Sequence, residues 1–183
     1  MEQKSIGLIE LSSIAAGFLV TDTMLKAAEV KLLINRTICS GKYLILVAGD
    51  VAAVQASVAA GMAAGGGSII DTCTIPNIDP ALFPAISGTV IVQSYAALGV
   101  IESFSVASLI EGADAAVKAA NVQLLEIRLA MALGGKAFVK LVGDVAAVQA
   151  AVQAGAERVA ERGLLVNKVV IPAPMAEIFG ETV

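Results

Sequence analysis

The 183-residue chain contains no histidine, only two cysteines and few aromatic residues, and each scarcity argues against a class of function. Two cysteines cannot build a disulfide framework, which fits a reducing cytosol. Without histidine the chain lacks the side chain most often used for acid–base catalysis at neutral pH. The sequence also shows no nucleophile–base pairing and no cofactor fingerprint, so an enzyme is the least favoured class.

Positive charge is scarce as well. Lysine and arginine total 12 against 16 acidic residues, which gives a net charge of −4 and a pI near 4.8. Nucleic-acid binding usually requires a basic patch or stripe. The chain has no basic run, and its aromatic content of 4% gives little surface on which bases could stack. We therefore expect no nucleic-acid partner.

Hydrophobic residues are abundant, at 57% of the chain with a mean hydropathy of +0.85, so a membrane protein is an alternative to weigh. Residues 51–70 and 80–101 are free of charge, but glycine, proline and polar residues interrupt both. Neither is the continuous apolar span of about 20 residues that a bilayer requires. Met1–Ser5 lacks the pattern of a signal peptide. We expect instead that apolar surface is buried against copies of the same chain.

Two copies of one pattern make up the chain. Residues 6–33 align with residues 98–125, and residues 41–61 align with residues 135–155. The segment Gly-Asp-Val-Ala-Ala-Val-Gln-Ala is identical in both copies. Two units of about 90 residues are too few and too long for a solenoid. The chain therefore reads as two copies of one small domain.

Each copy carries the same order of strand-like and helix-like segments. In the first copy these are residues 6–10 (strand), 15–29 (helix), 30–34 and 43–48 (a hairpin), 51–64 (helix) and 68–75 (strand). The pair Ser12-Ser13 is predicted to cap the first helix, and Asp50 is predicted to cap the second. The order β-α-β-β-α-β is that of the ferredoxin-like class. We predict an α/β (α+β) protein with domains at residues 1–90 and 91–183, each with one antiparallel sheet and helices on one face.

The two copies differ most at the hairpin turn. The first copy has Cys39 within residues 35–42, whereas the same region of the second copy, around residues 128–136, contains no cysteine and has two residues added. A duplicated protein that differs from itself at one loop is expected to have diverged in function there. These turns are therefore the candidate site.

Both copies resemble the bacterial microcompartment shell domain. Gly-Asp-Val-x-Ala-Val after the hairpin and a final strand ending in Ile-Pro occur in each copy. The resemblance covers nearly the whole chain, and the fusion of two copies is similar to the tandem subfamily. It implies a homotrimer that imitates a hexamer and tiles beside other shell proteins into flat facets in the bacterial cytoplasm. In that family the hairpin loops meet at the symmetry axis and line a pore.

The resemblance assigns the pore lining to residues of both loops: Thr37, Ile38, Ser40, Gly41, Met131, Ala132, Leu133 and Gly134. The loop around Cys39 is similar to that of tandem shell proteins from propanediol-utilisation compartments, which carry an iron–sulfur cluster on the axis. The implied cofactor is a [4Fe-4S] cluster shared by three subunits, for electron transfer across the shell or to encapsulated redox enzymes. A cluster needs several thiolates, and a three-fold axis would gather three copies of Cys39.

Two other functions remain open from the residues alone. In the first, Cys39 is an unliganded thiol in a pore that conducts small metabolites. In the second, the chain is a regulatory module that senses a small molecule, because tandem ferredoxin-like units also serve that role and fold does not fix function.

Two of the pairs of charged residues at repeated positions bear on function. The family assigns Lys26 and Lys118 to lateral contacts between oligomers, and the alternative is that they are solvated lysines near helix ends. Glu10 and Glu102 stand at equivalent strand ends, which indicates a structural role instead of acid–base catalysis. Cys73, in a predicted strand, is expected to pack in the core as a small hydrophobe.

Overall fold

The computed structural model describes residues 4–90, 95–130 and 134–179. Each half of the chain forms a domain with the predicted order of elements. The first contains β1 (Ser5–Leu11), α1 (Ile14–Ala27), β2 (Lys31–Ile38), β3 (Lys42–Gly49), α2 (Val51–Gly65) and β4 (Ile69–Pro76). The second contains β5 (Ala97–Ser103), α4 (Val106–Ala119), β6 (Gln123–Arg128), β7 (Ala137–Gly143), α5 (Val145–Ala160) and β8 (Leu165–Pro172).

Short helical segments complete the described chain. A 3₁₀ turn, η1 (Cys39–Gly41), joins β2 to β3, and η2 (Gly66–Ser68) joins α2 to β4. Helix α3 (Leu82–Ser87) follows the first domain, and η3 (Ala176–Phe179) follows the second.

Both sheets are antiparallel and have the same strand order. The first runs β2-β3-β1-β4 and the second β6-β7-β5-β8, which confirms the predicted fold class. The register irregularities repeat too, because the pairing with the last strand shifts after Glu10 in β1 and after Glu102 in β5. The duplication therefore extends from the sequence to the details of strand pairing.

Serine caps begin the first helix of each domain. Ser13 Oγ accepts a 3.3 Å hydrogen bond from the Ala16 N–H, and Ser105 Oγ accepts a 3.2 Å bond from the Ser108 N–H. Asp50 stands at the N-cap position of α2 as predicted, but its side chain makes no capping bond. The predicted N-cap position of Asp50 is therefore confirmed, without a capping bond from its carboxylate.

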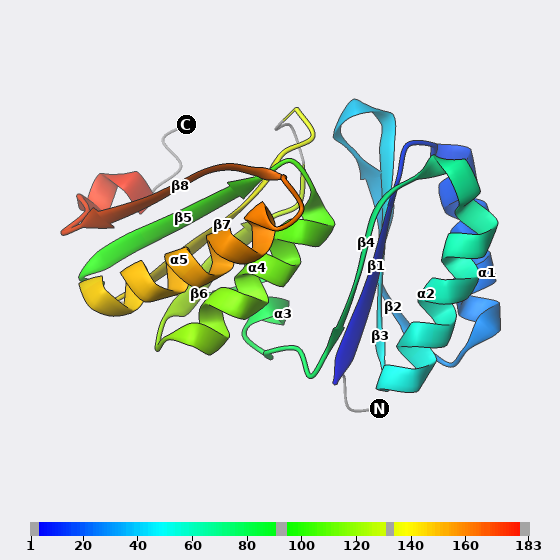
Figure 1. Ribbon diagram of the computed structural model, residues 1–183, viewed down its shortest axis with the longest axis horizontal. Helices are drawn as coiled ribbons and strands as arrows, with labels where there is room; N and C mark the ends of the chain where they lie inside the picture. The colour runs from blue at the N-terminus through cyan, green and yellow to red at the C-terminus, as the bar shows by residue number, and fades with distance from the viewer. Residues whose placement is uncertain (1–3, 91–94, 131–133, 180–183) are drawn as a thin grey trace.

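In each domain, helices pack on one face of the sheet. A helix of the second domain also packs on the other face of the first sheet. Figure 1 shows α1 and α2 on the outer side of the first sheet and α4 on the side toward the second domain. Ile9, Met24 and Val54 belong to the core under α1 and α2. The opposite face contributes Leu8 to a larger core that includes Ile110 of α4. Helix α4 thus packs against β1 and β4 as well as its own sheet.

A cluster of charged and hydroxyl side chains joins the two domains. Arg162 Nη1 donates to Asp71 Oδ1 of β4 at 2.7 Å, and Arg162 Nη2 donates to Glu111 of α4 at 3.0 Å. The second Asp71 oxygen accepts hydrogen bonds from the hydroxyls of Ser105 and Ser108. We call Asp71, Ser105, Ser108, Glu111 and Arg162 the ionic cluster.

The outer surface of α1 remains apolar and exposed. The exposed fractions of Ile14, Phe18, Leu19 and Leu25 are 40%, 61%, 58% and 40%.

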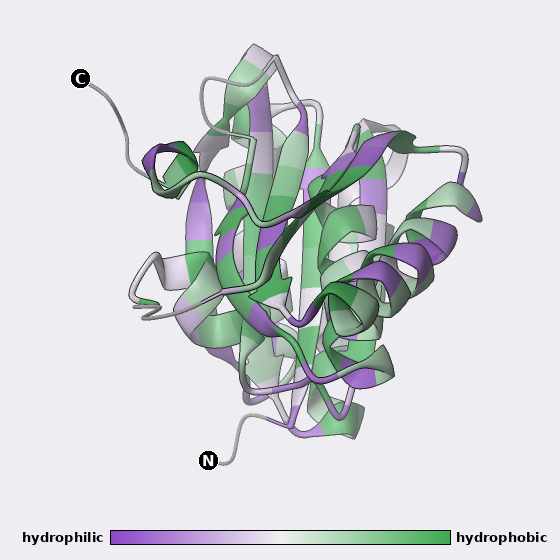
Figure 2. Cartoon of the chain, turned by 90° about the vertical axis from the view of Figure 1, so that its left-hand side faces the viewer, coloured by the Kyte–Doolittle hydropathy of each residue, from purple (hydrophilic) through white to green (hydrophobic). Residues whose placement is uncertain are grey.

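Figure 2 views the chain from the side of the second domain and shows hydrophobic stretches, in green, on strands that face the viewer. Among the described residues, no helix combines the length and apolar character that a membrane crossing requires.

Candidate functional site

The first hairpin turn is tight, and backbone geometry fixes its shape. Strand β2 extends to Ile38, so Thr37 and Ile38 end a strand instead of lying in the turn. Ser40 and Gly41 follow with φ angles of 61° and 72°, in the left-handed region that glycine tolerates best. The Lys42 N–H bonds back to the Cys39 carbonyl. Cys39 is partly exposed at the start of this turn.

The second hairpin turn also uses left-handed backbone. Ala130, Gly134 and Gly135 have φ angles of 50°, 62° and 86°. Ala130 is fully buried, so its strained conformation is held by surrounding structure. The predicted pore residues Met131, Ala132 and Leu133 lie outside the described residues, whereas Gly134 is described and exposed.

The structure brings the two turns together. The Cys39 N–H donates a 2.9 Å hydrogen bond to the Ala130 carbonyl. A Cβ placed on Gly135 would lie 3.9 Å from Ser40 Oγ and 3.8 Å from Lys42 Nζ. Cys39 therefore sits where the two domains contribute adjacent loops. We call these two turns, residues 39–41 and the described residues 130 and 134–135, the paired loops.

The sequence indicated Cys39, Ser40, Gly41 and Gly134 as site residues. It did not indicate the two residues of the second loop that contact the first, Ala130 and Gly135. The Gly-Gly pair at residues 134–135 pointed to a turn, yet nothing in the sequence indicated that Gly135 faces the first loop. Ala130 carried no signal, because alanine is not a residue expected at positive φ.

An ion pair lies at the base of each loop. Lys42 Nζ is 2.8 Å from Glu10 Oε1, and Glu10 is fully buried. In the second domain Lys136 Nζ is 2.5 Å from Glu102 Oε1. The two glutamates thus anchor the loops, which agrees with the structural role predicted for them.

A single chain brings one thiol to the paired loops. The other cysteine, Cys73, lies within β4 with 4% of its surface exposed, and burial raises the pKa of its thiol. Among the described residues, no group of three or more Cys, Asp, Glu or His side chains could hold a metal ion. The described residues of one chain thus offer a single cysteine sulfur at the paired loops.

The two repeated lysines have different surroundings. Lys26 Nζ pairs with Asp22 at 2.6 Å on the exposed surface of α1. Lys118 Nζ pairs with Asp114 at 2.6 Å and also donates to the Asn77 carbonyl of the first domain at 2.8 Å. Within one chain, Lys118 thus links the two domains. The lateral contacts assigned to both lysines stay a prediction.

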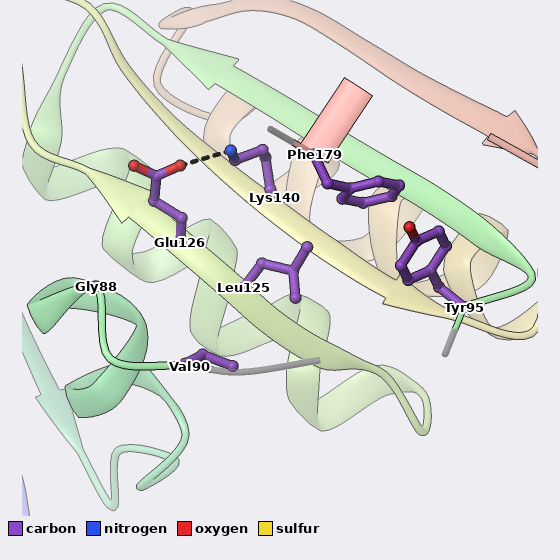
Figure 3. A pocket seen from close by; sticks show the side chains of 7 residues that line it. All are labelled: Gly88, Val90, Tyr95, Leu125, Glu126, Lys140 and Phe179. Atoms are coloured by element: carbon purple, nitrogen blue, oxygen red, sulfur yellow. Dashed lines mark ion pairs between the residues drawn. The ribbon is translucent and has the colours of Figure 1, made fainter. Parts of the chain in front are cut away.

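A pocket of about 350 Å³ lies on the second sheet and was not foreseen from the sequence. Figure 3 shows its lining, which is Gly88, Val90, Tyr95, Leu125, Glu126, Lys140 and Phe179. Tyr95 and Phe179 pack with ring centroids 4.0 Å apart. Lys140 Nζ lies 2.7 Å from Glu126 Oε2. Burial alone would raise the pKa of Glu126, but bonds from Lys140 and Arg128 outweigh it and lower that pKa.

Comparison with known proteins identifies both domains. The BMC domain family matches residues 5–78 and 97–174. The chain is 43% identical over 180 residues to the bacterial microcompartment shell protein PduT of Citrobacter freundii, covering 98% of each chain. It is also 43% identical over 83 residues to the shell protein EutM of Salmonella typhimurium, which covers 45% of this chain and 83% of EutM.

Solved structures give the same result. A microcompartment protein from Desulfitobacterium hafniense superposes with a TM-score of 0.87 at 50% identity, covering 95% of this chain and 97% of that one. A fused permuted hexameric shell protein from the RMM microcompartment superposes with a TM-score of 0.65 at 26% identity, covering 85% and 81%. With two BMC domains in one chain, this protein belongs to the BMC family of bacterial microcompartment shell proteins, as a tandem member of the PduT type.

Proposed function

We propose that three copies of this chain form a ring of six BMC domains that tiles into a microcompartment facet beside other shell proteins. The observation that supports it is the duplication itself. One chain supplies two domains of the same fold and strand order, and a fused relative is described as a hexameric shell protein. Three tandem chains supply the six domains of such a ring. The role is structural, without catalysis, in the shell within the bacterial cytoplasm.

We further infer that the ring places the paired loops around its axis and that three copies of Cys39 hold a [4Fe-4S] cluster there. Cys39 fits this role in three respects: it is partly exposed, it lies in a tight turn, and its N–H is anchored on Ala130. The fourth iron would take a non-protein ligand, since cysteines are the usual ligands and each chain brings one to the loops. When bound, such a group supplies one-electron transfer.

The chain's own residues would set the surroundings of that group. The anchored Cys39 N–H restricts the direction of the side chain, because both ends of the turn are tied down. Hydrogen bonds to cluster sulfurs and solvent exposure set the reduction potential of an iron–sulfur group. The N–H groups of Ser40 and Gly41 are the donors that we assign to this task. Encapsulated redox enzymes are the expected electron partners.

The alternative within the same assembly is an unmetallated pore for small metabolites. In this alternative the partly exposed Cys39 lines the pore without holding a metal. A sensing module is less well supported. It would need a pocket with charges available to a ligand, whereas Glu126 and Lys140 in the pocket on the second sheet pair with each other.

Anaerobic purification with iron and sulfide analysis tests the cluster. The sized wild-type trimer should contain about four irons and four sulfides and absorb in the visible range. Cys39→Ala should remain trimeric but colourless. Cys73→Val is the matched control, because Val169 stands at the equivalent position of the second domain, and it should keep its iron. A colourless, iron-free wild-type trimer would remove the cluster and leave the metabolite pore.

A further inference from the structure

Another pocket, of about 250 Å³, has walls from both halves of the chain. Arg36 of β2, residues 85–88 at the end of α3 and residues 126–129 of β6 line it. Helix α3 packs against β6, and the Gly88 N–H bonds to the Ala85 carbonyl at 3.4 Å, which ends the helix at the pocket. We call this cavity the Arg36 pocket. It shares Gly88 and Glu126 with the pocket shown in Figure 3.

The two copies carry an arginine at the same position but surround it differently. Arg36 lies opposite Leu44 in β3, and its counterpart Arg128 lies opposite Phe138 in β7. Arg128 Nε donates to Glu126 Oε1 at 2.7 Å. The first copy has an isoleucine, residue 34, where the second has Glu126. The carboxylate that neutralises one arginine is therefore missing beside the other.

Arg36 has no counter-charge within residues 4–90, 95–130 and 134–179, where its side chain makes no ion pair or hydrogen bond. The other three arginines each pair with a glutamate. Glu126 also lines the pocket, but its two oxygens are occupied at 2.7 Å each, one by Arg128 and the other by Lys140. The Arg36 pocket thus offers an uncompensated guanidinium charge, which the pocket of Figure 3 does not.

Apolar side chains make up much of the remaining lining. Ala85 and Ile86 contribute from α3, and Ile127 and Leu129 contribute from β6. A ligand pocket usually combines such a lining with a few polar groups that fix the orientation of the ligand, and this volume lies just below the usual range. The cavity therefore suits a small molecule with one anionic end and one apolar end.

We propose that the Arg36 pocket binds a small carboxylate with a short alkyl chain. The guanidinium donates from two nitrogens to the two carboxylate oxygens, a geometry that the planar fork of arginine matches. The alkyl chain lies against the apolar lining. A phosphate fits less well, because its remaining oxygens would face apolar side chains without hydrogen-bond partners. This binding site adds to the structural role proposed above and does not depend on the ring.

Saturation-transfer NMR on the full chain, with butyrate as the probe, tests the proposal. The buffer is low in salt and free of phosphate and other carboxylates, because salt screens an exposed arginine. We expect a dissociation constant of about 1 mM for so small a ligand. Butyramide has the same shape without the charge and should bind at least about tenfold more weakly. Butyramide that bound as tightly as butyrate would overturn the role of the guanidinium.

Inorganic phosphate, added as a competitor, tests the choice of a carboxylate. It should displace butyrate only at concentrations well above those at which unlabelled butyrate displaces itself. Phosphate that competed better than butyrate would overturn the assignment to a carboxylate. The absence of saturation transfer to butyrate, even far above the expected dissociation constant, would overturn the site as a whole. Neither result would touch the proposed ring, because the measurement does not depend on association between chains.

Two substitutions on β2 locate the binding. Arg36→Gln should weaken butyrate binding at least about tenfold. Lys31→Gln is the matched control, because Lys31 is an exposed cation on the same strand that does not line the pocket, and butyrate should bind it as it binds the wild type. Equal losses in the two variants would mean general electrostatic attraction and would overturn the site. Because Arg36 is exposed, both variants should give the circular dichroism of the wild type.

A third variant separates the geometry of Arg36 from its charge. Arg36→Lys keeps the positive charge but loses the planar fork that meets both carboxylate oxygens. We expect binding intermediate between that of the wild type and that of Arg36→Gln. An Arg36→Lys variant that bound butyrate as tightly as the wild type would overturn the two-nitrogen contact.

Discussion

Glu10 accepts a 3.1 Å hydrogen bond from the N–H of Val106, a residue 96 positions later that begins α4. The same carboxylate pairs with Lys42 at the base of the first loop. Because Glu10 is fully buried, one side chain ties the candidate site to the joint between the domains. The negative charge also stands at the N-terminus of a helix, where it is favoured.

Replacing Glu10 with glutamine should destabilise the chain. The amide keeps the shape but removes the charge that compensates Lys42 and the helix terminus, so we expect a loss of roughly 2 kcal/mol in the free energy of unfolding. Urea titration measures it. Glu29→Gln, on an exposed residue, should change the free energy by less than about 0.5 kcal/mol. Equal effects of the two substitutions would contradict the anchoring role of Glu10.

The equivalent glycines Gly61 and Gly155 should respond differently to alanine. A Cβ on Gly155 would lie 2.6 Å from the Gly112 carbonyl oxygen, where α4 and α5 cross. A Cβ on Gly61 would meet the side chains of Ile9 and Met24, at 2.6 and 2.7 Å. Backbone cannot yield as a flexible side chain can, so Gly155→Ala should lose roughly 2 kcal/mol.

Gly61→Ala is the paired comparison for this prediction. The gain in helix propensity of about 1 kcal/mol offsets much of its crowding, so its unfolding midpoint in urea should stay near that of the wild type. If Gly61→Ala proved the more damaging of the two, the close helix crossing would not be what requires glycine.

The fold was predictable because its signals are local and occur twice. Apolar spacing and the Ser12-Ser13 pair indicated the helices, and Gly-Asp indicated the ends of the hairpins. The N-cap position of Asp50 was predictable for the same reason, whereas the residue type alone does not determine whether its side chain turns back to bond the helix. Strand β2 is longer than predicted. The polar residues after Ile34 do not alternate with apolar ones, so the sequence indicated a turn there, but Asn35–Ile38 continue to pair with β3.

The contacts that form the paired loops and connect the two domains could not be predicted from the sequence. Arg162 and Asp71 are 91 residues apart, and neither belongs to a motif. The Cys39–Ala130 bond joins loops from different domains, and no pattern marked Ala130. Repetition could have helped: Leu19 and Glu111 share one repeat position, and a change from apolar to charged there indicates that the two helices have different surroundings.

The ion pairs of Glu126 should make stability depend on pH in acid. The pKa of Glu126 is lowered in the folded chain, so the carboxylate stabilises the fold above the unfolded value near 4.5, and this contribution is lost as pH falls through the folded pKa. Glu126→Gln should therefore lose up to about 1 kcal/mol at pH 7. The difference from wild type should shrink steadily below about pH 4.5, and urea titrations at several pH values measure it. A difference that grew in acid would contradict the sign of the shift.

Thiol labelling should separate the two cysteines of the metal-free protein. Cys73 is 4% exposed, and burial raises the pKa of its thiol, so the reactive thiolate is scarce and shielded. In native protein at pH 8, iodoacetamide should therefore add at most one label per chain, on Cys39, and denaturant should release a second site. Native Cys39→Ala should take up no label within the time that labels the wild type, as mass spectrometry can show. Rapid native labelling of Cys39→Ala would mean that β4 opens readily, and the joint between the domains would then be far less stable than its buried contacts indicate.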